Sequence, residues 1–164
     1  MANNNPSATM RSATPEDLPT ILALIKELAE YERLAHEVVV TQDLLEEHLF
    51  GAAPKAEVIL ALLDNEPVGF ALFFHNFSTF LGRPGIYLED LFVRPEARGK
   101  GIGKALMVKV AQIAVQRGCG RFEWAVLDWN EPSIEFYRRL GAVPQAEWTV
   151  QRLTGDALKT LANT

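Results

Sequence analysis

Residues 93–104 read VRPEARGKGIGK, and this stretch decides how the rest of the chain is interpreted. It follows an apolar, β-rich run and leads into a segment of helical spacing, which predicts a glycine loop between a strand and a helix. Glycines let backbone N–H groups approach an anion, and the helix N-terminus adds positive potential. Four basic side chains add formal charge: Arg94, Arg98, Lys100 and Lys104. We therefore expect a phosphate-binding loop rather than a solvated basic turn.

The glycine spacing excludes two common phosphate loops. A nucleotide-triphosphate loop needs four residues between its glycines and then lysine with serine or threonine. Here three residues separate Gly99 from Gly103, and an alanine follows Lys104. The dinucleotide fingerprint would need a third glycine at position 104, which is lysine here. That fingerprint also follows the first strand of its fold, whereas this loop lies late in the chain. A different phosphate ligand is therefore expected.

Length, charge and cysteine usage narrow the class of protein. The 164 residues fit a single domain over residues 9–164, preceded by a flexible polar tail over residues 1–8. The net charge of −5 argues against nucleic acid, and no apolar run is long enough to span a membrane. Because Cys119 is the only cysteine and the three histidines are scattered, we expect no disulfide, no metal site and a cytoplasmic location.

The order of elements predicts a mixed α/β fold. Hydrophobic spacing and turn residues favour strands at 9–13, 56–63, 68–77, 86–93, 121–128 and 147–153. Helices are expected from Thr14 to about Tyr31, from Thr41 to Gly51, from Gly103 to Gly118, over 130–140 and from Thr154. The stretch 64–67 reads as a tight hairpin turn, and 77–85 as a loop.

Several segments resemble one family of enzymes. The pattern R-x-x-G-x-G at residues 98–103 resembles the acyl-CoA pyrophosphate loop of the GNAT superfamily of N-acetyltransferases. The segments YLEDLFV (87–93), WNEPSIEFY (129–137) and LIKELAEYE (24–32) are similar to the spermidine/spermine (diamine) acetyltransferase branch. The resemblance implies a GNAT-type fold, with a mixed, mostly antiparallel central sheet flanked by helices.

The resemblance also implies that acetyl-CoA is the cosubstrate, and it carries cofactor contacts over to particular residues. The central strand would lend backbone groups of Leu91, Phe92 and Val93 to the pantetheine arm. The pyrophosphate would lie on Arg98, Gly99, Lys100, Gly101, Ile102, Gly103 and Lys104. Further contacts are expected from Asn130 and Ser133, although Asn130 is also a good helix N-cap.

The chemistry requires a neutral amine, a polarised thioester carbonyl and a proton for the departing thiolate. Tyr137 lies two helical turns after Asn130 on the same face, and we expect it to be the general acid. Alternation along the central strand places Glu89 with Tyr87 and Leu91, and Asp90 on the other face. The resemblance makes Glu89 the base or a substrate contact, and we expect a structural role for Asp90.

The acceptor site is expected at the end of the first helix. Residues 26–47 carry seven acids against two bases, which usually marks only a solvated face. The resemblance implies that Tyr31, Glu32 and Glu89 bind a small cationic amine, with Glu147 and Trp148 added from the second subunit of a homodimer. The chain departs from the family pattern at Ser12 and over 144–149, which affects the acceptor side more than the cofactor side.

These observations favour an acetyl-CoA-dependent N-acetyltransferase that modifies a primary amine of a small polyamine or diamine by direct attack. One alternative is an acetyltransferase for a lysine-like amino acid side chain, which would need a carboxylate-binding cation near the site. A second alternative is a CoA-binding sensory or interaction module without turnover. The sequence does not fix the preferred amine or the acyl-chain limit.

Overall fold

The computed structural model of the protein describes residues 8–164, so the expected tail at residues 1–8 lies outside the described residues except for its last position. The chain divides into two compact units, Met1–Ala125 and Val126–Thr164. Along residues 8–164 no helix is long and apolar enough to cross a membrane.

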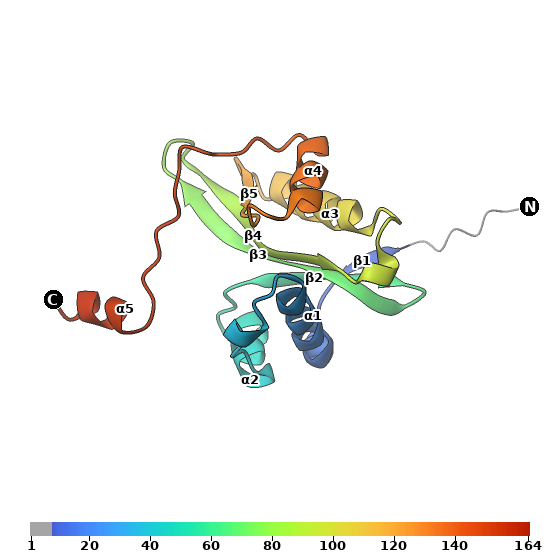
Figure 1. The fold of residues 1–164 in the computed structure, drawn as a ribbon, viewed down its shortest axis with the longest axis horizontal. Helices are drawn as coiled ribbons and strands as arrows, with labels where there is room; N and C mark the ends of the chain where they lie inside the picture. Colours follow the sequence, from blue (N-terminus) through green and yellow to red (C-terminus); the bar gives the residue numbers. More distant parts are fainter. Residues whose placement is uncertain (1–7) are drawn as a thin grey trace, which may run out of the picture. The chain divides into compact units, whose positions relative to one another are not determined.

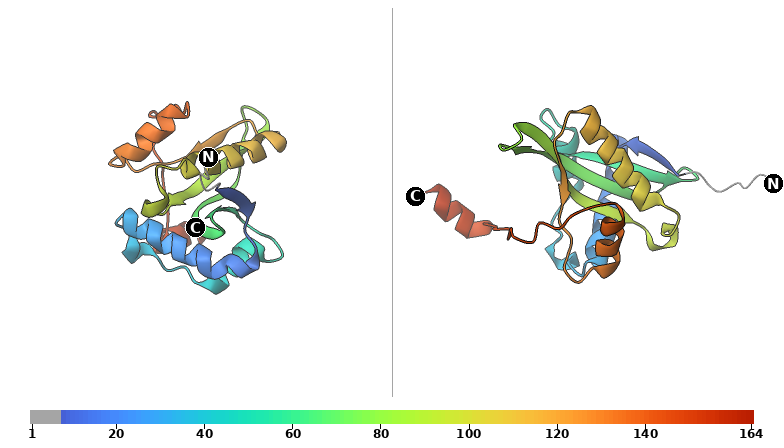
Figure 2. Two further views of the ribbon diagram at one scale, coloured as in Figure 1. Left: turned by 90° about the vertical axis from the view of Figure 1, so that its right-hand side faces the viewer. Right: turned by 90° about the horizontal axis from the view of Figure 1, so that it is seen from above.

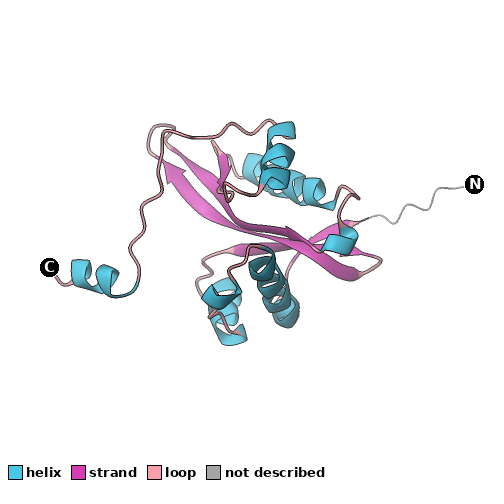
Figure 3. Ribbon diagram, in the orientation of Figure 1, coloured by secondary structure: helices cyan, strands magenta, loops and turns pink. Residues whose placement is uncertain are grey.

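The first unit is built on one five-stranded sheet whose order follows the chain. The strands are β1 (Thr9–Ser12), β2 (Glu57–Leu63), β3 (Glu66–Ser78), β4 (Arg83–Val93) and β5 (Phe122–Trp124). The first four strands pair antiparallel, and β4 pairs parallel with β5. The predicted mixed α/β fold with a mostly antiparallel central sheet is confirmed (Figure 3).

Helices cover both faces of this sheet. They are α1 (Leu18–Tyr31), α2 (Gln42–Leu45), which continues as a π-helical turn over Glu46–Phe50, and α3 (Ile102–Gln116). Figure 1 shows α1 and α2 on one face and α3 on the other, and Figure 2 shows α3 crossing the strands. Apolar side chains of α1 pack on Leu60, Phe70 and Phe92, while α3 buries Leu106 and Val110. The first unit therefore has a helix–sheet–helix core.

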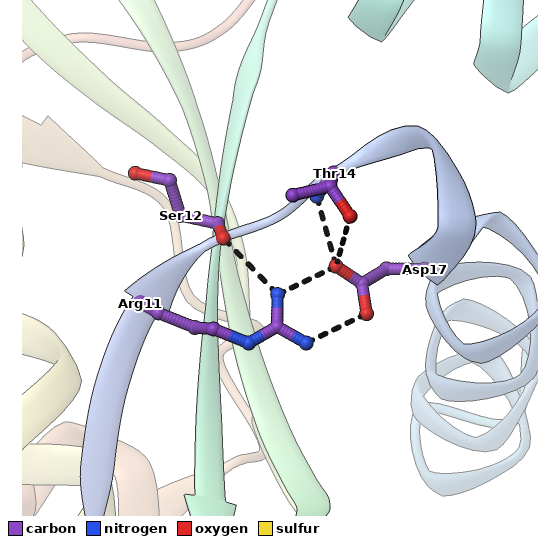
Figure 4. Close-up of polar contacts among 4 residues, drawn as sticks. All are labelled: Arg11, Ser12, Thr14 and Asp17. Atoms are coloured by element: carbon purple, nitrogen blue, oxygen red, sulfur yellow. Dashed lines mark hydrogen bonds and ion pairs between the residues drawn. The ribbon is translucent and has the colours of Figure 1, made fainter.

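The start of α1 is fixed by an ion pair with β1 (Figure 4). Arg11 donates from Nη1 and Nη2 to the two carboxylate oxygens of Asp17, at 2.6 and 2.8 Å. The backbone N–H of Thr14 donates to the same carboxylate at 2.8 Å, which completes a capping box. The guanidinium and these hydrogen bonds lower the pKa of Asp17 to about 2. The predicted cap at Thr14 is thus present, on a 3-10 turn over Pro15–Asp17, and the Arg11–Asp17 pair holds the start of α1 against β1.

The predicted turn between β2 and β3 is confirmed. Asp64 and Asn65 both have positive φ, 52° and 66°, as a two-residue type I′ hairpin turn requires. The predicted loop over 77–85 is wrong in part, because β3 and β4 stay paired up to Ser78 and Arg83. Gly85 permits this pairing, since a Cβ there would collide with the amide oxygen of Asn76.

Two other strand predictions need correction. The strand expected at 121–128 is only β5, because its ladder with β4 stops at the pair Leu88–Trp124. Residues 147–153 form no strand in the part of the chain that the structure describes. The second unit contains the helices α4 (Glu131–Arg139) and α5 (Gly155–Ala162) but no strand with which that segment could pair. Suitable side chains alone do not make a strand when its backbone groups lack a partner.

Candidate active site

The glycine loop lies between β4 and α3, as predicted. Gly99 and Gly101 have φ values of +75° and +77°, a backbone region that glycine adopts without strain, and a Cβ at either position would meet no atom within 4 Å. Gly101 is also the N-cap of α3, and the first turn of that helix has no acidic side chain. The loop therefore directs helix-terminal N–H groups toward open space, which suits an anion.

The basic residues of the loop have different roles. Lys100 and Lys104 are exposed beside the start of α3. Arg94, by contrast, donates from Nε and Nη2 to both carboxylate oxygens of Glu27, each at 2.8 Å, and from Nη1 to the carbonyl of Pro67 at 3.0 Å. Arg94 therefore joins α1 to the start of β3, and its predicted contribution to the phosphate site is wrong.

Arg98 connects the loop to the end of α1. Its Nε donates to the carbonyl of Val93 at 2.8 Å, and its guanidinium carbon lies 4.7 Å from the centre of the Tyr31 ring. The same carbon lies 5.7 Å from the centre of the Phe92 ring. These distances correspond to cation–π contacts. The structure thus brings together a predicted cofactor residue, Arg98, and a predicted acceptor residue, Tyr31.

The end of α1 is held by a Schellman motif. Leu34 donates its N–H to Ala29 at 2.8 Å, and Arg33 donates to Glu30 at 3.1 Å. Arg33 occupies the left-handed position of this motif with φ 63°, where glycine is usual. The motif fixes Tyr31, the last helical residue, and Glu32, the C-cap, at the same end of the sheet as Phe92. Burial raises the pKa of Glu32.

A β-bulge in β4 rearranges the two neighbouring carboxylates. Asp90 pairs with Leu72 while Leu88 pairs with Phe73, so Glu89 is the extra residue of the bulge. The predicted alternation is interrupted at the bulge: Glu89 is exposed, whereas Asp90 is half-buried and shares the face of Phe92, as predicted, but not that of Leu88. Burial, with added repulsion from Glu89 and Glu32, raises the pKa of Asp90 to about 7. The raised pKa that suits a proton acceptor thus belongs to Asp90.

The strand that follows the bulge has an open side. Leu91, Phe92 and Val93 pair with β3, but across residues 8–164 the parallel ladder with β5 covers only 86–88. Backbone groups of β4 after the bulge therefore face away from β3 without a strand beside them. A peptide-like chain can extend such an edge by main-chain hydrogen bonds. This arrangement fits a pantetheine arm that leads toward the glycine loop.

The remaining predicted residues belong to the second unit. The side chain of Asn130 accepts a hydrogen bond from the N–H of Ser133 at 3.4 Å and caps α4, as expected. Tyr137 follows two turns later, with its ring 5.2 Å from that of Phe136. Asn130, the N-cap of α4, and Tyr137, within α4, both belong to the second unit, and their roles at the glycine loop stay predictions. Glu147 and Trp148 are exposed in the same unit.

Two features of this site were not predicted from the sequence. They are the proton-acceptor character of Asp90 and the contact of Arg98 with Tyr31. The character of Asp90 was missed because the prediction assumed strict alternation along β4, and residue types do not reveal a β-bulge. The contact between Arg98 and Tyr31 could not be predicted, because no spacing rule joins positions 31 and 98. The only signal for it in the sequence is the presence of aromatic residues in nearby segments. No group of three or more His, Cys, Asp or Glu side chains that could hold a metal occurs within 8–164.

Comparisons with known proteins agree with this geometry. Residues 21–142 match the model of the acetyltransferase (GNAT) family. A thialysine N-epsilon-acetyltransferase from Sus scrofa is 40% identical over 95% of this chain and 98% of its own length. An L-ornithine N5-acetyltransferase from Arabidopsis thaliana is 36% identical over 93% of this chain and 86% of its own.

Two further matches concern the branch and the fold. A spermidine/spermine N(1)-acetyltransferase-like protein from Homo sapiens is 31% identical over 93% of this chain, which spans 23% of that protein. An integron cassette protein from the mobile metagenome of V. cholerae matches in structure with a TM-score of 0.82 and 28% identity, over 96% of this chain and 99% of its own. The predicted resemblance and the predicted enzyme class are confirmed. The chain belongs to the acetyltransferase (GNAT) family and is an N-acetyltransferase that acts on amines.

Proposed function

We propose that this enzyme transfers an acetyl group from acetyl-CoA to the side-chain amine of a small diamino acid. The observation that supports acetyl-CoA as the donor is the glycine loop at the start of α3, next to the open side of β4. For the acceptor, relatives named for thialysine and L-ornithine favour the amino-acid alternative over the polyamine that the sequence analysis preferred. Both relatives are named for amino acids that carry a second amine.

The cofactor would lie along the sheet edge and the loop. Leu91, Phe92 and Val93 would pair with the pantetheine arm through their backbone. The N–H groups of residues 99–104, with the charges of Lys100 and Lys104, would hold the pyrophosphate. Open space above Gly99 and Gly101 supports this placement. Asn130 and Ser133 would add contacts from the second unit.

The chain supplies proton transfer, while acetyl-CoA supplies an activated thioester. Asp90, with its pKa of about 7, would take a proton from the ammonium group, directly or through water, and so make the amine neutral. Glu89 would contact the acceptor from the exposed bulge. Tyr137 would then donate a proton to the departing thiolate, uphill by roughly 2 kcal/mol from the ordinary pKa values of a phenol and a thiol. No acyl-enzyme is needed.

Steady-state release of the CoA thiol across a panel of amines tests this function. The panel contains ornithine, lysine and thialysine, and it also contains putrescine, spermidine and spermine. We expect the amino acids to give the higher kcat/KM. The proposal would be contradicted if folded protein released no CoA thiol with any amine of the panel.

A polyamine acceptor is the second candidate, and the acidic residues favour it. Glu32, Glu89 and Asp90 interact electrostatically, so they could hold the charged end of a long cation. In that case Glu32→Gln should raise the polyamine KM, flatten its dependence on salt and change kcat less. A higher kcat/KM for spermidine than for every amino acid would select this candidate.

We further propose that the enzyme is a homodimer. The segment 147–153 carries the exposed apolar side chains Trp148 (79%), Val150 (77%) and Leu153 (51%). Several large apolar side chains exposed within one short segment favour a surface that another chain covers. Glu147 would then approach the acceptor site of a second copy.

A further inference from the structure

We propose that Tyr31 is a positioning residue for the cofactor, because its ring holds the guanidinium of Arg98 where the pyrophosphate of acetyl-CoA binds. The family resemblance assigns Arg98 to the cofactor and Tyr31 to the acceptor amine. The inference therefore gives Tyr31 a second role, toward the other substrate. It rests on the proposed function, since that function places acetyl-CoA at the glycine loop.

The ring of Tyr31 is a fixed surface. Tyr31 is the last residue of α1, and the Schellman motif at that helix end fixes its backbone. Its side chain is half-buried and packs against the core cluster that contains Leu28 and Phe92. A ring that is held by the core on one side does not follow the movements of an exposed neighbour. It can therefore restrict the neighbour's movements instead.

Arg98 is such an exposed neighbour, and two kinds of contact restrict it. Its Nε donates to the carbonyl of Val93 at 2.8 Å. Its guanidinium carbon lies over the Tyr31 ring, 4.7 Å from the ring centre, and 5.7 Å from the centre of the Phe92 ring. A cation–π contact uses no N–H group, so the Nη groups of Arg98 keep their hydrogen-bonding capacity for phosphate oxygens.

This restraint matters because a long side chain loses rotational freedom when it binds an anion. Part of that entropic cost is already met where the guanidinium is held in advance, so the cofactor binds more tightly. Tyr31 contributes more to the restraint than Phe92 does, since its ring is the nearer one. Changes at Tyr31 should therefore alter the affinity for CoA, which a residue that only contacts the acceptor would not do.

The test measures the Kd of CoA by calorimetry, with no acceptor amine present. Tyr31→Leu removes the ring and keeps an apolar side chain against the core, and Tyr31→Met is a second variant without a ring. We expect both to weaken CoA binding by about 2- to 10-fold, the range of a cation–π contact at a partly exposed site. Tyr31→Phe keeps the ring, so its Kd should match that of the wild type.

A double-mutant cycle shows whether Tyr31 acts through Arg98. In the Arg98→Gln background, Tyr31→Leu should cause no further loss of CoA affinity, because the guanidinium that the ring holds is gone. Lys100→Gln is the matched control, since it also removes a charge from the loop. In that background Tyr31→Leu should keep its full effect.

Two results would overturn the inference. The first is a wild-type Kd in both variants without a ring. The second is an equal loss with and without Arg98, because Tyr31 would then act through the general structure of the loop. A wild-type protein that does not bind CoA would instead contradict the proposed function itself.

Discussion

Replacing Asp90 with asparagine should stabilise the protein at high pH. The carboxyl has an ordinary pKa of 3.8 in the unfolded chain and a pKa of about 7 in the fold, because burial and the nearby Glu89 and Glu32 disfavour its charge. Between these two values the folded protein binds more protons than the unfolded one. Its free energy of unfolding therefore falls as the pH rises from about 4 to about 7, and it stays flat above that. Asparagine has nearly the same shape and no such dependence.

The size of the effect follows from the difference between the two pKa values. About 3.2 units, from 3.8 to about 7, correspond to roughly 4 kcal/mol at about 1.4 kcal/mol per unit over the whole titration. About half of that change falls between pH 5.5 and pH 8.5, a range that avoids the acid region where other carboxylates titrate. Since Asp90 keeps partial exposure, we expect the stability difference between variant and wild type to grow by about 1–2 kcal/mol over this range.

Urea unfolding of both proteins at pH 5.5, 7 and 8.5 measures this difference. Asp17→Asn is the matched control, because the ion pair with Arg11 lowers the pKa of Asp17 to about 2 and so leaves no titration above pH 5. That variant should be destabilised by a constant amount at all three pH values. The reasoning would be refuted if Asp90→Asn differed from wild type by the same amount at pH 5.5 and pH 8.5.

Four other outcomes are expected. Gly101→Asp should greatly weaken CoA binding in calorimetry, because it places a carboxylate and a strained backbone at the N-cap of α3, and unchanged affinity would remove the loop assignment. Tyr137→Phe should lower kcat by about 10² with little change in CoA affinity, whereas wild-type turnover would leave the acid role to water. Light scattering should give the mass of a dimer, and a monomer at assay concentration would count against a site shared between subunits. In acid titrations, Asp17→Asn should abolish the part of wild-type stability that is lost as the pH falls from about 4 to about 2, and an unchanged acid transition would show that the Arg11 pair contributes nothing.

The local parts of the fold and the site were predictable from the sequence. Glycines at 99 and 101 before a helical pattern indicate the anion loop, and a Thr14 cap, an Asp64–Asn65 turn and an Asn130 cap are signals contained in a few residues. Each depends on backbone conformations that only certain residue types adopt easily.

The nonlocal parts were not predictable. The bulge at Glu89 depends on the register between β3 and β4, and that register leaves Glu89 exposed and Asp90 half-buried beside Phe92. The pairing of Arg94 with Glu27 joins residues 67 positions apart, so no short motif could separate Arg94 from the cations of the loop. Likewise, an isolated strand pattern at 147–153 could not show that its own unit offers no neighbour.

The three contacts of Arg94 determine how this part of the molecule should open. Its guanidinium binds α1 through Glu27 and the start of β3 through the carbonyl of Pro67, and its backbone N–H donates to the carbonyl of Val68 at 2.9 Å. Breaking the pair with Glu27 would leave two charged groups without compensation, so the segments that Arg94 joins should exchange their amide hydrogens as one cooperative unit. The helix α1, which carries the expected acceptor residues, and the strand β4, which leads into the glycine loop, would then loosen together. Local fluctuations would therefore not move the acceptor site relative to the cofactor site.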